Sequence, residues 1–259
     1  MNRTTAPRLE LRDVFVSFGA IEAVQNFSLT IRNHEFVALV GPSGCGKTTL
    51  LNLLAGFTRP SSGNLFRNGR SRMVHQQDGL FPWLTAAENI ALGLSHVAGR
   101  ASRDRQVADM LDLIGMRGFE RHYPHQLSGG MRQRVELARA LAGGSDILLL
   151  DEPFCSLDYL TRLRLRDELA RLLECRQRTV VLVTHDIEEA AQLADRVVVL
   201  TPRPARIRSE FTIEAPRPRK VGDPDIVDAV VRILSALEPQ NIESAPPAYT
   251  HRSETEFAR

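Results

Sequence analysis

The stretch that decides the fold is Phe36-Val37-Ala38-Leu39-Val40-Gly41-Pro42-Ser43-Gly44-Cys45-Gly46-Lys47-Thr48-Thr49. An apolar run leads into a glycine-rich turn, and a helix-compatible run follows from Thr49 to Leu54. This order leaves several backbone N–H groups pointing at one spot, where a phosphate group can accept them. The spacing is that of the Gly-x-x-x-x-Gly-Lys-Ser/Thr phosphate loop. The bland alternative, a ligand-free glycine-rich turn, fits this spacing less well.

Two residues of this loop have specific chemistry. Lys47 is one of only two lysines in the chain, which otherwise uses arginine for positive charge. A lysine at this position therefore indicates that a compact ammonium is needed between two phosphates. The hydroxyl of Thr48 is suited to ligate Mg²⁺.

A second apolar run, from Ile147 to Leu150, ends in Asp151-Glu152-Pro153. A run without polar alternation is typical of a parallel strand that is buried on both faces. At its carboxyl end Asp151 is placed to bind Mg²⁺, directly or through water, and Glu152 to polarise an attacking water molecule. In isolation the two acids would suit a solvated strand end equally well. A phosphate loop upstream favours the catalytic interpretation.

A second candidate cradle for phosphate follows the same physics, and it reads Leu127-Ser128-Gly129-Gly130-Met131. Ser128 is a good helix N-cap, and the two glycines expose backbone N–H groups. Small and apolar residues then recur at helical spacing up to a stop at Gly143, namely Met131, Val135, Ala138 and Ala142. Alone, this pattern is also that of an ordinary capped turn. Its position shortly before the Asp151 strand strengthens it.

Composition sets limits on the class of protein. The chain has 259 residues, enough for one large core with an inserted subdomain, and its 43% hydrophobic and 25% charged residues are typical of a soluble globular protein. A net charge of +2 gives no general argument for nucleic-acid binding. No apolar stretch reaches the length of about 18 residues that spans a bilayer, and no signal-peptide pattern begins the chain.

The cysteines and a cluster of arginines have plain interpretations. Cys45, Cys155 and Cys175 show no C-x-x-C spacing, which favours a reduced cytoplasmic setting without disulfides or zinc. Oxidation of Cys45 could block the phosphate loop, but a small residue there needs no further reason. The arginines between Arg162 and Arg178 alternate with acids, a pattern of a solvated helix face.

The order of motifs predicts an α/β fold with a mostly parallel sheet. Strands are expected at Leu9–Val16 and Phe27–Ile31 in an N-terminal β layer, and near 147–151, 180–184 and 197–200 in the core. Helical periodicity dominates from about 81 to 142, which predicts an inserted helical subdomain. Asp186-Ile-Glu-Glu189 has a capping-box pattern, and Asp223-Pro224 starts a helix with Ile226, Val230, Ile233 and Leu237 on one face. We expect one domain over 1–240 and a polar, disordered tail over 241–259.

With these motifs intact and in order, the chain resembles an ATP-binding cassette (ABC) ATPase subunit over residues 9 to about 210. The resemblance implies a phosphate-loop NTPase core with an N-terminal antiparallel β layer, and ATP and Mg²⁺ as ligands. By the same resemblance Phe18 stacks on adenine, Gln76 senses the γ-phosphate and Mg²⁺, and His185 contacts the γ-phosphate. Asp158 would communicate across a dimer, and residues Leu127 to Met131 would form the signature that acts on the partner's ATP.

The segment around the only tryptophan suggests a branch of this family. Asp78-Gly-Leu-Phe-Pro-Trp83-Leu-Thr follows Gln76, where the family docks a transmembrane partner; the alternative is a tryptophan of the core. The Pro-Trp pair and the signature most resemble the nitrate, sulfonate and taurine importers. We therefore expect an importer ATPase acting as a homodimer, with two permease subunits docked near Trp83 and a periplasmic or extracellular solute-binding protein. It would work at the cytoplasmic face of the inner membrane without binding nucleic acid.

A few residues depart from the family pattern, and the sequence leaves rival functions open. His34 stands where glycine is usual, so the turn before Phe36 is expected to be strained or differently shaped. The short segment between Gly69 and Val74 is expected to trim a hairpin of the β layer, while His75 and Cys155 replace commoner residues. Another small solute, for example a pyrimidine or a thiamine precursor, is an alternative cargo. A soluble, non-transport ABC ATPase and a non-hydrolysing regulatory module are less favoured alternatives.

Overall fold

The computed structural model describes residues 7–75, 79–175 and 177–238, without the side chains of 174 and 175. Gln76 and the tail over 241–259 lie outside the described residues, so what was predicted for them stays a prediction.

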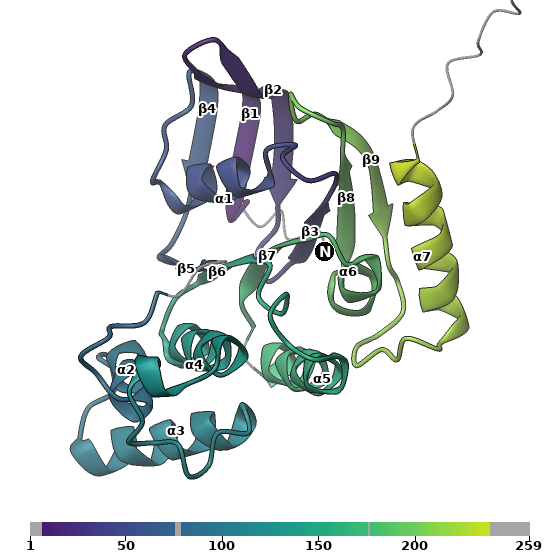
Figure 1. The fold of residues 1–259 in the computed structure, drawn as a ribbon. Helices are drawn as coiled ribbons and strands as arrows, with labels where there is room; N and C mark the ends of the chain where they lie inside the picture. Colours follow the sequence, from purple (N-terminus) through teal and green to yellow (C-terminus); the bar gives the residue numbers. More distant parts are fainter. Residues whose placement is uncertain (1–6, 76–78, 176, 239–259) are drawn as a thin grey trace, which may run out of the picture.

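Two sheets form the framework of the molecule (Figure 1). The first is antiparallel, in the order β2-β1-β4, and comprises β1 (Leu9–Phe18), β2 (Ile21–Ile31) and β4 (Ser62–Arg67). The second has the order β5-β6-β7-β3-β8-β9, and only β9 runs antiparallel to its neighbour. Its strands are β3 (Phe36–Val40), β5 (Ser71–Val74), β6 (Ile147–Asp151), β7 (Thr179–Thr184), β8 (Arg196–Leu200) and β9 (Ile207–Thr212). The predicted fold class is confirmed.

Helices cover both faces of the second sheet. They are α1 (Lys47–Ala55), α2 (Ala86–Gly93), α3 (Arg100–Leu113), α4 (Gly129–Ala142), α5 (Tyr159–Cys175), α6 (Ile187–Leu193) and α7 (Pro224–Leu237), with a 3₁₀ turn at Pro124–Gln126. Because side chains of a strand alternate between faces, Val37 and Leu39 join a core with α1 and the antiparallel sheet. Phe36, Ala38 and Val40 join the other core, with α4 to α7, α2 and α3. Within the described parts of the chain, no helix has the length and apolarity needed to cross a membrane.

The segment around Gly69 differs from its prediction. β4 belongs to the antiparallel sheet and β5 to the parallel sheet, so the two do not form the expected trimmed hairpin. The short connection between them is held from the side, because the Arg70 N–H donates to the Asp146 carboxylate at 3.0 Å. β2 also begins earlier than predicted, at Ile21, through the tight pairing of Phe18 with Ile21.

The turn before the first core strand is strained, as predicted. His34 has a φ of 64°, a left-handed conformation that costs energy for any residue with a Cβ atom. Its N–H donates to the hydroxyl of Thr179 at 2.9 Å, which fixes the turn against β7.

Candidate functional site

Three adjacent parallel strands bring the predicted motifs to one edge of the sheet. β6 pairs with β7 and β7 with β3, with Asp151 opposite Val183 and Val40 opposite Thr184. Parallel strands end on the same side, so the phosphate loop after β3, the acids after β6 and His185 after β7 meet there. This is the crevice at the carboxyl ends of strands where open α/β sheets place their ligands.

The phosphate loop has a backbone that only glycine allows at its last turn. Gly46 has a φ of 118°, and a Cβ atom there would lie 2.8 Å from the carbonyl oxygen of Ala23. Lys47, which is almost fully buried, donates from Nζ to the carbonyl oxygens of Gly41 and Pro42, both at 2.8 Å. The ammonium therefore lies inside the ring of the loop, beside the first turn of α1 and its unpaired N–H groups.

Asp151 and Thr48 form an oxygen-donor pair next to the loop. Asp151 is 3% exposed, and burial raises the pKa of its carboxyl, while a hydrogen bond with Thr48 lowers it. Glu152 raises this pKa further, whereas His75 and Lys47 lower it. A buried carboxylate beside a hydroxyl is a hard oxygen set of the kind that Mg²⁺ prefers, so the residues present fit that ion.

Glu152 and His185 are in direct contact. Nδ1 of His185 lies 3.2 Å from Oε2 of Glu152, and the ring is 59% exposed. Glu152 has a φ of 48°, a left-handed conformation, and is held there because its N–H donates to the Val183 carbonyl at 2.9 Å. Backbone strain of this kind is concentrated at functional sites, and no pattern in the sequence predicts it here.

A buried ionic cluster lies directly behind His185. Arg166, which is 1% exposed, contacts the carboxylates of Asp186 and Glu189. Burial raises the pKa of Glu189 to about 7, although Arg166 lowers it. The prediction of a solvated arginine face on this helix is therefore wrong for Arg166 and for the half-buried Arg162.

The helix α6 begins with only one of the two hydrogen bonds of the predicted capping box. Asp186 accepts the Glu189 N–H at 3.0 Å, as an N-cap should. The Glu189 carboxylate does not return to the Asp186 N–H; it accepts the Thr184 hydroxyl at 2.9 Å. The Asp186 N–H donates instead to that same hydroxyl at 3.0 Å, while the Glu189 carboxylate also accepts from Arg166.

The signature turn caps α4 as expected and lies against the strand of acids. Ser128 accepts the Met131 N–H at 3.3 Å. A Cβ atom on Gly130 would lie 3.0 Å from the Ser156 carbonyl oxygen, so glycine permits close packing here. Ser128 and Gly129 themselves are exposed.

Gln133 is a residue of this region that the sequence did not single out. Its side chain donates to the Glu152 carbonyl at 3.1 Å and accepts the Ser156 N–H at 3.2 Å. It thus ties the helix of the signature to the turn that follows Glu152. In the sequence, only its place one turn into that helix pointed to such a role.

Two further predicted residues lie on exposed ends of elements. Phe18 ends β1 and is 53% exposed, in a hairpin whose second strand carries Ala23, the residue whose carbonyl oxygen lies beside Gly46. Asp158 lies just before α5 and accepts the Thr161 N–H at 3.0 Å, which lowers the pKa of its carboxyl. The described free cysteines are Cys45, which is buried with a raised pKa, and the exposed Cys155.

Comparisons with known proteins agree with this geometry. The family described as ABC transporter matches residues 24–155. The chain is 41% identical over 229 residues to the aliphatic sulfonates import ATP-binding protein SsuB 1 of Agrobacterium fabrum, covering 87% of this chain and 82% of that one. It is 42% identical over 202 residues to the taurine import ATP-binding protein TauB of Roseobacter denitrificans, covering 74% and 75%.

Solved structures show the same likeness. The ATP-binding cassette MJ0796, seen as a post-hydrolysis dimer bound to ADP and phosphate, superposes with a TM-score of 0.72 at 32% identity. The match covers 80% of this chain and 100% of that one. The phosphate loop, the carboxylate strand and these relatives lead to one conclusion: the chain belongs to the ABC transporter family and is an ATP-binding, ATP-hydrolysing cassette.

Proposed function

We propose that this cassette is the ATPase subunit of an importer for a small anion such as a sulfonate, taurine or nitrate, and that two copies hydrolyse ATP at shared sites. The observation that carries the chemistry is the contact of Glu152 with His185, at the edge where the phosphate loop also lies.

The residues divide the work as follows. Backbone N–H groups from Gly41 to Thr49 would hold the phosphates, and Lys47 would leave its carbonyl partners to place its charge between the β- and γ-phosphates. Thr48, Asp151 and Gln76 would hold Mg²⁺, which would supply charge neutralisation at the transferred phosphoryl group. Phe18 offers an exposed ring to adenine, since stacking needs only a π-face.

Glu152 would then accept the proton of the attacking water. His185, whose ring contacts this carboxylate, would also contact the terminal phosphate and so fix their relative position. Such a general base contributes about 10²–10⁴-fold in rate.

The second copy would complete each site. Leu127 to Met131 form a capped helix start whose exposed N–H groups suit a phosphate, yet α4 and α1 belong to cores on opposite faces of the sheet (Figure 1). A partner turned head to tail would bring its signature over this phosphate loop, with Asp158 at the contact. The dimeric relative bound to ADP and phosphate supports this arrangement.

The surface proposed for the permease is formed by the Trp83 loop and by the cavity of about 350 Å³ that its Phe81 lines together with residues of β5 and α4. Trp83 is 67% exposed and its ring centroid lies 5.3 Å from that of Phe81, so the interpretation as a core tryptophan is wrong. The buried Asn89 fixes this loop: it accepts the Phe81 N–H at 2.9 Å and donates to the carbonyls of Leu84 and Thr85, both at 3.0 Å.

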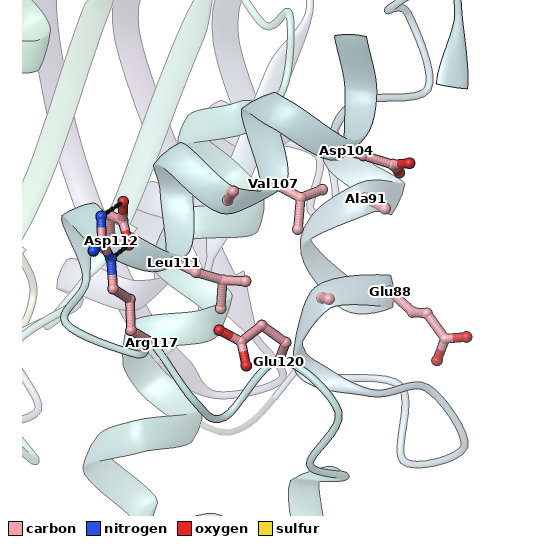
Figure 2. Close-up of a pocket in the computed structure, with 10 residues that line it drawn as sticks. Glu88, Ala91, Asp104, Val107, Leu111, Asp112, Arg117 and Glu120 are labelled. Carbon is pink, nitrogen blue, oxygen red and sulfur yellow. Dashed lines mark hydrogen bonds and ion pairs between the residues drawn. The ribbon is translucent and has the colours of Figure 1, made fainter. Parts of the chain in front are cut away.

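An exposed aromatic anchor beside the cavity that Phe81 lines suits a short amphipathic helix of a membrane partner. Docked there, the cassette would lie on the cytoplasmic face of the inner membrane. A separate groove, none of whose described lining residues belongs to the Trp83 loop, runs between α2 and α3 and has a volume of about 560 Å³. Figure 2 shows Val107 and Leu111 along this groove, with the ion pair of Asp112 and Arg117 to one side.

The proposed cargo rests on the names of the relatives, which import taurine and aliphatic sulfonates. A solute-binding protein would select it outside the membrane, and a pyrimidine or thiamine precursor is the alternative cargo. Measuring which of these solutes binds to the solute-binding protein encoded beside this gene tests the choice.

The chemical role has a direct test. Glu152→Gln should keep ATP affinity and lose most turnover, by about 10²-fold or more, because it removes the base without changing the shape of the side chain. Steady-state phosphate release and nucleotide binding measure the two quantities. Wild-type turnover in this variant would overturn the assignment.

A further inference from the structure

We propose that Arg162 is a positioning residue for His185, linking the turn at Leu157–Asp158 to the γ-phosphate side of the site. The inference rests on the proposed roles of Glu152 and His185. It concerns the first turn of α5, which the sequence pattern had suggested to be solvated.

The guanidinium of Arg162 joins two loops of the site, the turn that contains Leu157 and the turn that contains Asp186. Its Nη1 donates to Oδ2 of Asp186 at 3.2 Å, and its Nη2 donates to the Leu157 carbonyl at 3.2 Å. Its backbone N–H donates to the Asp158 carbonyl at 2.9 Å. One side chain therefore fixes the turn proposed to face the partner subunit against the residue next to His185.

The Asp186 end of this link belongs to a network of contacts around His185. Asp186 also contacts Arg166, accepts the Glu189 N–H at 3.0 Å and donates its own N–H to Thr184 at 3.0 Å. Thr184 and Asp186 are the residues before and after His185, so its backbone is fixed on both sides. A displacement of Asp186 must move the imidazole.

The other end leads back to the catalytic carboxylate. The turn from Glu152 to Leu157 is closed by the Cys155 N–H on the Glu152 carbonyl at 3.3 Å and by the Leu157 N–H on the Phe154 carbonyl at 3.2 Å. The contact of Glu152 with His185 at 3.2 Å then completes a ring of residues. Arg162 is the member of this ring that spans from the turn to Asp186.

This placement assigns Arg162 a specific task. When a partner subunit presses on the turn at Leu157–Asp158, the planar guanidinium carries that shift to Asp186 and so to His185. A lysine could satisfy Asp186 or the Leu157 carbonyl, but its single ammonium lacks the fork that satisfies both.

The test uses steady-state ATP hydrolysis by the purified chain. Arg162→Ala should lower kcat by about tenfold and leave KM for ATP within about twofold, because the imidazole is misplaced while the phosphate loop is intact. Arg162→Lys should recover part of the loss. Arg171→Ala, an exposed arginine of the same helix, is the matched control and should change neither quantity.

A double-mutant cycle with His185→Ala separates positioning from plain stabilisation. If Arg162 acts through His185, adding Arg162→Ala to His185→Ala should cost less than about twofold more in kcat. If the losses in kcat of the two single variants multiply in the double variant, or if Arg162→Ala leaves kcat unchanged, the inference is overturned. Should Arg162→Ala fail to fold, the same cycle with Arg162→Lys decides. An unchanged kcat in His185→Ala itself would instead count against the proposed role of His185.

Discussion

At the residue scale, the site combines groups whose neighbours set their chemistry. Asp151 is a buried carboxylate that a cation would stabilise, Glu152 is held in a strained backbone, and Glu189 is buried beside Arg166. The two acids at the end of β6 are adjacent in sequence but differ in surroundings. This difference suits the roles proposed above, that of a metal ligand for Asp151 and that of a proton acceptor for Glu152.

Glu189 gives a pH-dependent prediction. Burial raises its pKa from 4.5 to about 7, so the folded protein binds this proton more tightly than the unfolded chain does. Its contribution to stability is therefore fully present below pH 4.5 and is lost as the pH rises through about 7. Glu189→Gln should remove this loss and flatten the dependence of the unfolding free energy on pH.

Urea unfolding at pH values from about 5 to about 8, the range in which this contribution is lost, measures the effect. Glu188→Gln, one residue earlier in α6, is the control and should keep the wild-type slope. Identical slopes for wild type and Glu189→Gln would contradict the assignment of Glu189.

At the element scale, the loop before α2 presents apolar residues to solvent while hydrogen bonds from two helices hold its backbone. Asn89 holds Phe81, Leu84 and Thr85. From α4, Glu136 accepts the Gly79 N–H at 2.9 Å. A rigid loop that exposes Trp83 and Phe81 loses little entropy when a partner binds.

Trp83→Ala should therefore weaken permease binding without unfolding the cassette. Interface aromatics often contribute about 2 kcal/mol or more to binding, whereas an exposed side chain changes folding stability by less than about 1 kcal/mol. Leu80, in the same loop, is buried, so Leu80→Ala should cost about 2–5 kcal/mol of stability.

Thermal melts run alongside co-purification with the permease separate the two effects. Phe66→Ala, an exposed aromatic on β4, is the control for binding. A strongly destabilised Trp83→Ala that still binds the permease normally would remove the docking proposal.

The same elements show what the sequence could and could not predict. The phosphate loop, the cap at Ser128 and the strand before Asp151 follow local rules of spacing, and each forms where predicted. The burial of Arg166 depends on α6, which packs against it from farther along the chain, so helix periodicity misread this residue. The hydrogen bonds of Asn89 are local but follow no recognised spacing, and they were missed. The strand β5 was missed as a core strand because it is a short edge strand, Ser71-Arg72-Met73-Val74, whose first two residues are polar.

At the scale of the whole molecule, the proposed mechanism gives one chain two half-sites rather than one complete site. The phosphate loop joins α1 and the antiparallel sheet in one core, and the signature begins α4 in the other. The proposed mechanism therefore requires that ATP bind between two copies. Each copy then supplies its phosphate loop to one site and its signature to the other.

The formation of an ATP-dependent dimer tests this central claim most directly. Glu152→Gln should trap bound ATP, so in size-exclusion chromatography with ATP the purified chain should shift from monomer to dimer. Ser128→Arg in the same background should abolish the shift, since a bulky cation at the exposed signature turn would clash where the partner's γ-phosphate must lie. A dimer that forms without ATP, or that forms regardless of Ser128→Arg, would contradict the head-to-tail sandwich.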